Sequence, residues 1–356
     1  MKKIKYWDGL RTLACLQVVL SHICMAFYPN ASGIIYTIGY LCMMLLLILS
    51  GGVLSLKTYR SNEEQTRGLF GKDILFYTLK RYFRLLPVVA VSILISLLLY
   101  KTGGYYCRVL SEKYGLLKLG TYFPDGISIA EGIVDAFIGA FFFRPQLNAP
   151  FWTIHYEILG AIGVYALMKL FYKNKMRWMI YIAVGGVCFL VDIYVASMFA
   201  GMVLFDIFYN EEGVIGNKVK EWMKKYHYFC TLIVAATFLL LLFMNKGKIR
   251  FVLAMEICLC IYSYGIIQKI LSWHPLVALS EYSYSIYGIH WIVICSFSAG
   301  GIYYLCDANN YLPVSIFVNV IGVGIIILAA VLIRKFVEMP LSGLFGRLLK
   351  RMGIGT

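Results

Sequence analysis

Apolar residues fall into ten long runs along the chain, with short polar segments between them. Most runs approach the roughly 20 residues that a helix needs to cross a membrane, so we predict ten transmembrane helices. Asp192 interrupts the long run 177–209, which we therefore divide into two short spans. The predicted spans are 9–28, 34–56, 85–100, 151–171, 177–193, 194–209, 228–244, 251–271, 283–305 and 314–333.

A further apolar segment, 133–143, is too short to cross a membrane and lies in a long loop at about 101–150. We expect it to be re-entrant or to lie at the membrane surface. No linker, low-complexity tract or internal repeat divides the sequence. The pattern therefore predicts one membrane-embedded domain, 1–356, with an all-α fold: a polytopic helix bundle.

Composition supports this prediction, because 61% of the 356 residues are hydrophobic and only 14% are charged. Soluble domains carry about 25% charged residues. The composition excludes a soluble globular enzyme, a disordered chain and a nucleic-acid-binding domain, although the net charge is +15.

The basic residues predict the topology. With the N-terminus inside, 25 of the 33 Lys and Arg residues fall in inner segments and 8 in outer loops. Cytoplasmic loops of membrane proteins carry an excess of basic residues. We therefore predict a multi-pass protein of the inner (cytoplasmic) membrane whose two termini are both in the cytoplasm. Arg11 and His22 interrupt the first apolar run and no cleavage pattern follows it, so we interpret it as a retained helix.

Ten cysteines are present, and none has the spacing of a zinc site. We therefore expect neither a metal centre nor a bound cofactor. Cys107 and Cys306 lie in predicted outer loops, and the sequence leaves open whether they form a disulfide.

Titratable residues inside predicted spans are costly, so each is a functional candidate. Arg11 and His22 are 11 residues apart, which places them on one helix face about 16 Å apart along the axis. Arg81 and Arg84 form a fork at the inner edge of a span, suited to phosphates. Ordinary alternatives stay open: Arg11 could reach the headgroups, His22 could be a structural residue, and the fork could be a positive flank.

Other candidates lie in the fourth and ninth predicted spans. Glu157 is expected at a depth similar to that of His22, where a carboxylate could fix the tautomer of the imidazole. Tyr287 and His290 are three residues apart and share a helix face, although aromatic residues in such places usually pack. Asp206 lies near a span end and is expected to be solvated.

Six short motifs follow one another in order along the chain. They are DGLRTLA at 8–14 with the later His22, LSG at 49–51, RYFR at 81–84, FWTIHYE at 151–157, SYSIYGIH at 283–290 and VEMP at 337–340. Each is weak alone, but the ordered set resembles membrane acyltransferase family 3, the O-acyltransferases of bacterial envelope and secreted glycans. Thr12, Gly52 and His155 depart from the family pattern. Some members carry a fused periplasmic hydrolase-like domain, which we do not expect here.

The resemblance implies an acyl-CoA donor, most often acetyl-CoA, and a carbohydrate hydroxyl as acceptor. Arg81, Arg84 and Arg11 would hold the nucleotide phosphates of cytoplasmic acyl-CoA. His22 would act as general base or as a transient acyl acceptor, with Glu157 orienting its ring. Tyr287 or His290 would line the donor channel or bind the oxyanion.

A transporter or flippase of a glycan or lipid-linked sugar is the alternative, because buried charges also mark transport pathways. The acceptor class includes envelope glycans and lipid-linked sugars, and the bilayer is a partner in either case.

Overall fold

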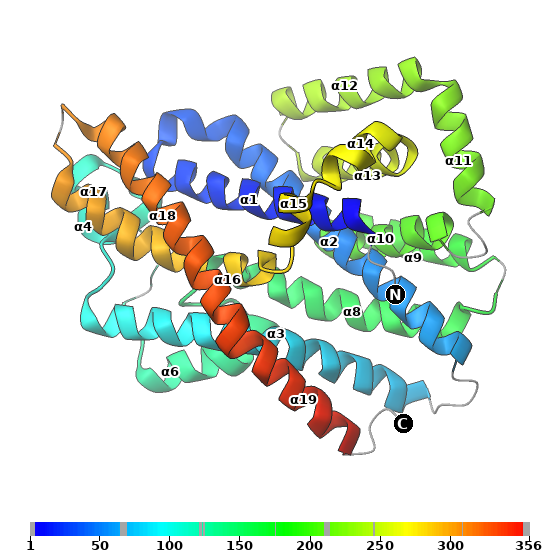
Figure 1. The fold of residues 1–356 in the computed structure, drawn as a ribbon, viewed down its shortest axis with the longest axis horizontal. Coiled ribbons are helices and arrows are strands. Elements are labelled where there is room, and N and C mark those ends of the chain that lie inside the picture. Colours follow the sequence, from blue (N-terminus) through cyan, green and yellow to red (C-terminus); the bar gives the residue numbers. More distant parts are fainter. Residues whose placement is uncertain are drawn as a thin grey trace.

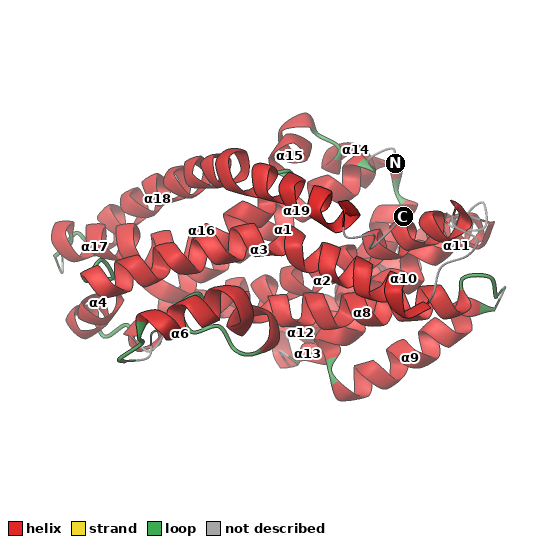
Figure 2. Cartoon of the chain, turned by 90° about the horizontal axis from the view of Figure 1, so that it is seen from below, coloured by secondary structure: helices red, strands yellow, loops and turns green. Residues whose placement is uncertain are grey.

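The computed structural model describes residues 4–64, 70–120, 123, 125–174, 176–209, 214–244, 246–307 and 309–351. Within these residues every regular element is a helix, as Figures 1 and 2 show, which confirms the predicted all-α bundle.

The long helices are α1 (Lys5–Phe27), α2 (Ser32–Glu64), α3 (Phe70–Thr102), α8 (Trp152–Phe171), α9 (Arg177–Val191), α10 (Ile193–Tyr209), α12 (His227–Met244), α13 (Gly247–Ser263) and α18 (Tyr311–Ile333). The shorter α-helices are α4 (Cys107–Tyr114), α5 (Leu117–Gly120), α6 (Ile129–Val134), α7 (Ala140–Phe142), α11 (Val214–Lys225), α14 (Gly265–Leu271), α15 (His274–Leu279), α16 (Ser283–Val293), α17 (Ala299–Leu305) and α19 (Met339–Arg351). Two 3₁₀ turns, η1 (Pro29–Ala31) and η3 (Ala149–Phe151), and three π-helical turns, η2 (Asp135–Gly139), η5 (Ile294–Ser298) and η6 (Arg334–Glu338), complete the described elements.

Seven helical stretches in the described residues are long and apolar enough to cross a membrane, or eight if the bent pair α13 and α14 counts as one span. The helices α9 and α10 are apolar but shorter. Each predicted run is therefore helical, while the number of ten spans stays a prediction.

One predicted span, 251–271, is wrong as a straight helix. The chain bends by 97° between α13 and α14, where Tyr264 adopts an extended conformation. The break frees backbone carbonyls, and the Gln268 side chain donates hydrogen bonds to those of Ile261 and Tyr262. Backbone groups released within a membrane need such partners, so a side chain sustains the bend.

The division of 177–209 at Asp192 is confirmed. Asp192 accepts hydrogen bonds from the backbone N–H groups of Tyr194 and Val195, at 2.8 and 3.1 Å, and so caps the start of α10. Asp206 is not solvated as expected. The neighbouring α9 brings Arg177 to its carboxylate, with Nε at 3.1 and 3.0 Å from the two oxygens. A buried carboxylate is tolerated when it is paired in this way.

The apolar segment 133–143 forms the end of α6, then η2 and α7, rather than a span. It lies along α3, where Tyr82 donates a hydrogen bond to the Phe137 carbonyl at 2.7 Å. The buried Asp135 carboxylate accepts from the N–H groups of Gln146 and Leu147. This segment therefore ties the loop that precedes α8 to the bundle.

Helices α2 and α10 approach each other backbone to backbone at the centre of the bundle. A Cβ added at Gly51 would lie 1.9 Å from the Met198 carbonyl oxygen, and one added at Gly201 would lie 1.9 Å from that of Ile48. Small residues allow this close approach between membrane helices. The contact fixes the depth of Ser50, which faces the site described below.

The two described ends of the chain lie at one end of the bundle, away from α4 and α17 at the other end (Figures 1 and 2). This arrangement agrees with termini on one side of the membrane, and their cytoplasmic location stays a prediction. Cys107 and Cys306, whose pairing the sequence left open, are both free thiols.

Candidate active site

Two adjacent cavities lie inside the bundle. The arginine cavity, of about 490 Å³, is lined from the end that holds the termini by Trp7, Asp8, Arg11, Ser50, Arg81, Arg84, Glu157, Glu281, Tyr284, Arg334 and Glu338, among others. The histidine cavity, of about 150 Å³, is lined by His22 and by the aromatic side chains of Tyr36, Tyr40, Trp152, Tyr287 and Trp291, among others. The structure thus separates the predicted residues into a basic group and a histidine group.

Arg81 is held in place by two partners. Its Nη2 donates to Ser50 Oγ at 2.6 Å and forms an ion pair with Glu157 Oε2. The Arg81 side chain is buried, and its Nε makes no hydrogen bond with the described residues. These contacts commit Nη2, so only the remaining N–H groups of Arg81 could contact a ligand.

The Glu157 pairing corrects one expectation. We expected this carboxylate beside His22, but it is paired with Arg81 across the arginine cavity. Glu157 lies one helical turn beyond Thr153 on α8, deeper than the histidine cavity. A carboxylate inside a membrane protein requires a cation, and the guanidinium of α3 provides it.

Arg84 differs from the other two candidate arginines. Arg11 forms an ion pair with Asp8 at 3.0 Å, in the first turns of α1. Arg84 lines the same cavity with an accessible side chain and makes no ion pair or hydrogen bond with the described part of the chain. Its five N–H donors therefore have no acceptor among the described residues, and the side chain lines the cavity.

Two acidic residues of the arginine cavity, Glu281 and Glu338, lie on the side formed by η6 and the turn before α16. Glu338 accepts from Ser285 at 2.9 Å and pairs with Arg334 at 2.9 Å, and Arg334 lies 3.8 Å from Glu281. These contacts join the C-terminal motif 337–340 to the motif 283–290. The sequence motifs at both positions therefore meet in space.

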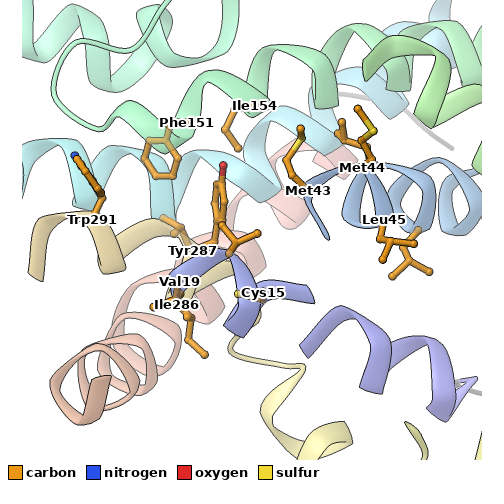
Figure 3. Close-up of a cluster of buried hydrophobic side chains, with 14 of the residues drawn as sticks. Cys15, Val19, Met43, Met44, Leu45, Phe151, Ile154, Ile286, Tyr287 and Trp291 are labelled. Carbon is orange, nitrogen blue, oxygen red and sulfur yellow. The ribbon is translucent and has the colours of Figure 1, made fainter. Parts of the chain in front are cut away.

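The two cavities meet at three residues that line both of them: Met43, Thr153 and Tyr287. The Tyr287 hydroxyl donates a hydrogen bond to the Pro150 carbonyl and lies 2.8 Å from Thr153 Oγ1. Figure 3 shows the Tyr287 side chain projecting from α16 among Phe151, Ile154 and Met43. We call Met43, Thr153 and Tyr287, which line both cavities, the partition. Met43 and Thr153 carry no charge inside a span, so sequence reasoning missed them.

His22 and His290 are in direct contact. His290 Nε2 lies 3.0 Å from His22 Nδ1, and His290 Nδ1 lies 2.7 Å from the Tyr287 carbonyl oxygen. His290 is fully buried, whereas His22 is half-buried and lines the histidine cavity. The Trp291 ring meets the His22 ring edge-on at 5.5 Å. The structure thus pairs two candidates that the sequence placed 268 residues apart.

The aromatic walls of the histidine cavity come from three helices, α2, α8 and α16. Tyr36 and Tyr40 lie one turn apart on α2 with their hydroxyls 2.9 Å apart, and Trp152 lies 6.4 Å from the Tyr40 ring. The i, i+4 spacing of the two tyrosines was the available sequence signal. His155 lines neither of these two cavities, and its Nδ1 lies 3.2 Å from the Phe141 carbonyl oxygen.

Comparison with known proteins gives one family. The sequence model of an acyltransferase domain, acyltransferase family 3, matches residues 4–334. Searches of curated proteins and of solved structures found no match. The matched range includes all residues named for the two cavities except Glu338.

The pairing of Arg81 with Glu157 can be tested by thermodynamic coupling. We expect Arg81→Gln and Glu157→Gln each to lower the free energy of unfolding in detergent, and the double variant to lose less than their sum. The coupling should be about 0.5–3 kcal/mol, as for residues in contact. A His22→Gln/Glu157→Gln cycle is the control and should be additive. Coupling of Glu157 to His22, and none to Arg81, would contradict the observed pairing.

Proposed function

The protein belongs to acyltransferase family 3, and we propose that it transfers an acyl group, most simply acetyl, from cytoplasmic acyl-CoA to a carbohydrate hydroxyl across the membrane. The observation that carries this proposal is the pair of cavities that meet at the partition. Family membership supports transfer chemistry over the transporter alternative.

The arginine cavity is the proposed donor site. Acyl-CoA is polyanionic, and guanidinium groups bind phosphate oxygens through parallel N–H donors. We assign the main phosphate contact to Arg84, because its donors are uncommitted in the described residues, and supporting contacts to Arg81 and Arg11. Glu157 acts by holding Arg81 rather than by touching the reacting atoms.

The histidine cavity is the proposed acceptor site. Sugar rings expose apolar C–H faces between their hydroxyls, and aromatic walls with a few polar groups suit such a surface. Tyr36, Tyr40, Trp152 and Trp291 supply the walls, and His22 supplies an imidazole among the residues that line it. The charge distribution supports an acceptor that enters from the non-cytoplasmic side.

The reaction would take place at the partition. His22 removes the proton of the acceptor hydroxyl, whose oxygen attacks the thioester carbon. The C–S bond then breaks, and His22 passes this proton to the CoA thiolate, which leaves as the free thiol. A variant of this path, in which the acyl group first forms an acyl-imidazole on His22, uses the same contacts.

Tyr287 has two assignments within this scheme. In the resting structure its hydroxyl donates to the Pro150 carbonyl, so it closes the partition together with Thr153. When the acyl group enters between these residues, the released hydroxyl is placed to donate to the oxyanion. His290 contacts His22 directly, so its proposed role is to position His22, the base.

The donor site predicts unequal roles for the arginines. Arg84→Ala should weaken acetyl-CoA binding by roughly 10- to 100-fold, the value of one charged hydrogen-bonding group. Arg84→Lys should restore only part of the affinity, because lysine lacks the planar fork. Calorimetry on the purified protein measures both.

Arg347→Ala is the matched control, since Arg347 is exposed on α19 and does not line the cavity. Unchanged affinity in Arg84→Ala would return Arg84 to an ordinary positive flank of the membrane.

The role of His22 predicts a separation of binding from chemistry. His22→Gln keeps side-chain volume but cannot accept the proton, so transfer should fall by roughly 10²–10⁴-fold. Acetyl-CoA affinity and thermal stability should stay close to the parent values. Transfer is followed as acetyl groups gained by isolated envelope glycan, with His155→Gln as the control. Near-normal transfer by the Gln variant would make His22 a structural residue.

A further inference from the structure

His290 has both ring nitrogens engaged. Its Nδ1 lies 2.7 Å from the Tyr287 carbonyl oxygen and its Nε2 lies 3.0 Å from His22 Nδ1. The side chain is fully buried and lines neither of the two cavities, so His290 is out of reach of both proposed substrates. Its role therefore has to pass through His22.

The backbone carbonyl determines the position of the His290 proton. A carbonyl oxygen can only accept a hydrogen bond, so the proton of the Tyr287–His290 contact is on Nδ1 of His290. In a neutral imidazole the other nitrogen then carries a lone pair. Neutral His290 is the expected form, because a positive charge on a side chain buried inside a membrane bundle is costly.

The same reasoning extends to His22. The lone pair on His290 Nε2 requires a donor, and the atom in contact with it is His22 Nδ1. His22 is therefore protonated on Nδ1, and its Nε2 carries the lone pair. Because His22 lines the histidine cavity and His290 lies behind it, the ring edge with Nε2 is the one available to the cavity.

We infer that His290 is a positioning residue that fixes His22 in the Nδ1–H tautomer and thereby makes His22 Nε2 the base at the histidine cavity. The inference rests on the proposed function only in naming Nε2 as the base. When His22 accepts the proton of the acceptor hydroxyl on Nε2, the cation donates a charge-assisted hydrogen bond from Nδ1 to His290. His22 later passes the Nε2 proton to the CoA thiolate, and His290 takes part in no proton transfer.

A neutral orienting residue suits this location. A carboxylate in the same role would add a charge within the bundle, and the nearby Glu157 is already paired with Arg81.

The turn of α16 from Tyr287 to His290 also links the partition to the histidine pair. Tyr287 closes the partition with its hydroxyl and holds His290 with its carbonyl.

The direct test is nitrogen NMR of protein labelled with ¹⁵N in its five histidines, in lipid bilayers without substrate. His22, identified by the signals lost in His22→Gln, should show a protonated Nδ1 and an unprotonated Nε2. A protonated Nε2 on His22 would overturn the inference. The measurement needs no acceptor, so a failure of acyl transfer leaves its outcome intact.

Two variants separate positioning from packing. His290→Gln offers an amide oxygen where Nε2 accepts, so it should keep the His22 tautomer and a substantial part of kcat. His290→Leu removes the acceptor and should lower kcat by roughly 10²-fold or more, since enzymes with a misoriented histidine lose up to about 10⁴-fold. KM for acetyl-CoA should change little, measured by release of the free thiol.

His155→Leu is the matched control, because its Nδ1 also contacts a backbone carbonyl, that of Phe141, away from both cavities. It should leave kcat and the His22 tautomer unchanged. Equal losses of kcat in the Gln and Leu variants of His290, with the His22 tautomer unaltered in both, would show that His290 only packs.

Discussion

Two hydroxyl groups, those of Tyr287 and Thr153, meet beside the Pro150 carbonyl, and this contact divides the interior into the arginine and histidine cavities. The contact joins α16 to the start of α8. The same turn of α16 carries His290, whose Nδ1 lies 2.7 Å from the Tyr287 carbonyl oxygen, so the partition and the histidine pair share one structural element. An acyl group that passes from one cavity to the other would therefore have to open the partition without turning the His22 ring.

The three candidate arginines of the arginine cavity differ in whether an acidic side chain pairs with them. Glu157 and Ser50 fix Arg81, and Asp8 pairs with Arg11, so these two cations are largely neutralised before any ligand arrives. Arg84 is left as the accessible cation of this trio, within the described residues. A cavity in a membrane protein that keeps one arginine without an acidic partner is arranged for an anion, because an unpaired charge there is costly.

The sequence predicted the helical fold well, because apolar runs and basic flanks report directly on the membrane. It also placed His22, Tyr287, His290 and the arginines correctly on their helices. It could not pair Glu157 with Arg81, because depth along a helix does not say which neighbour a side chain faces. The bend at Tyr264 is accompanied by local hydrogen bonds from Gln268 to the carbonyls of Ile261 and Tyr262, which the apolar pattern does not show. The partition residue Thr153 carries no charge that would mark it.

The central claim, transfer across the membrane through two joined cavities, is tested most directly in sealed proteoliposomes. Labelled acetyl-CoA is enclosed inside, and isolated envelope polysaccharide is supplied only outside, so that neither can cross the bilayer. The account predicts that label appears on the external polysaccharide and that free CoA accumulates inside. Label on the polysaccharide only when both substrates are on the same side would contradict it.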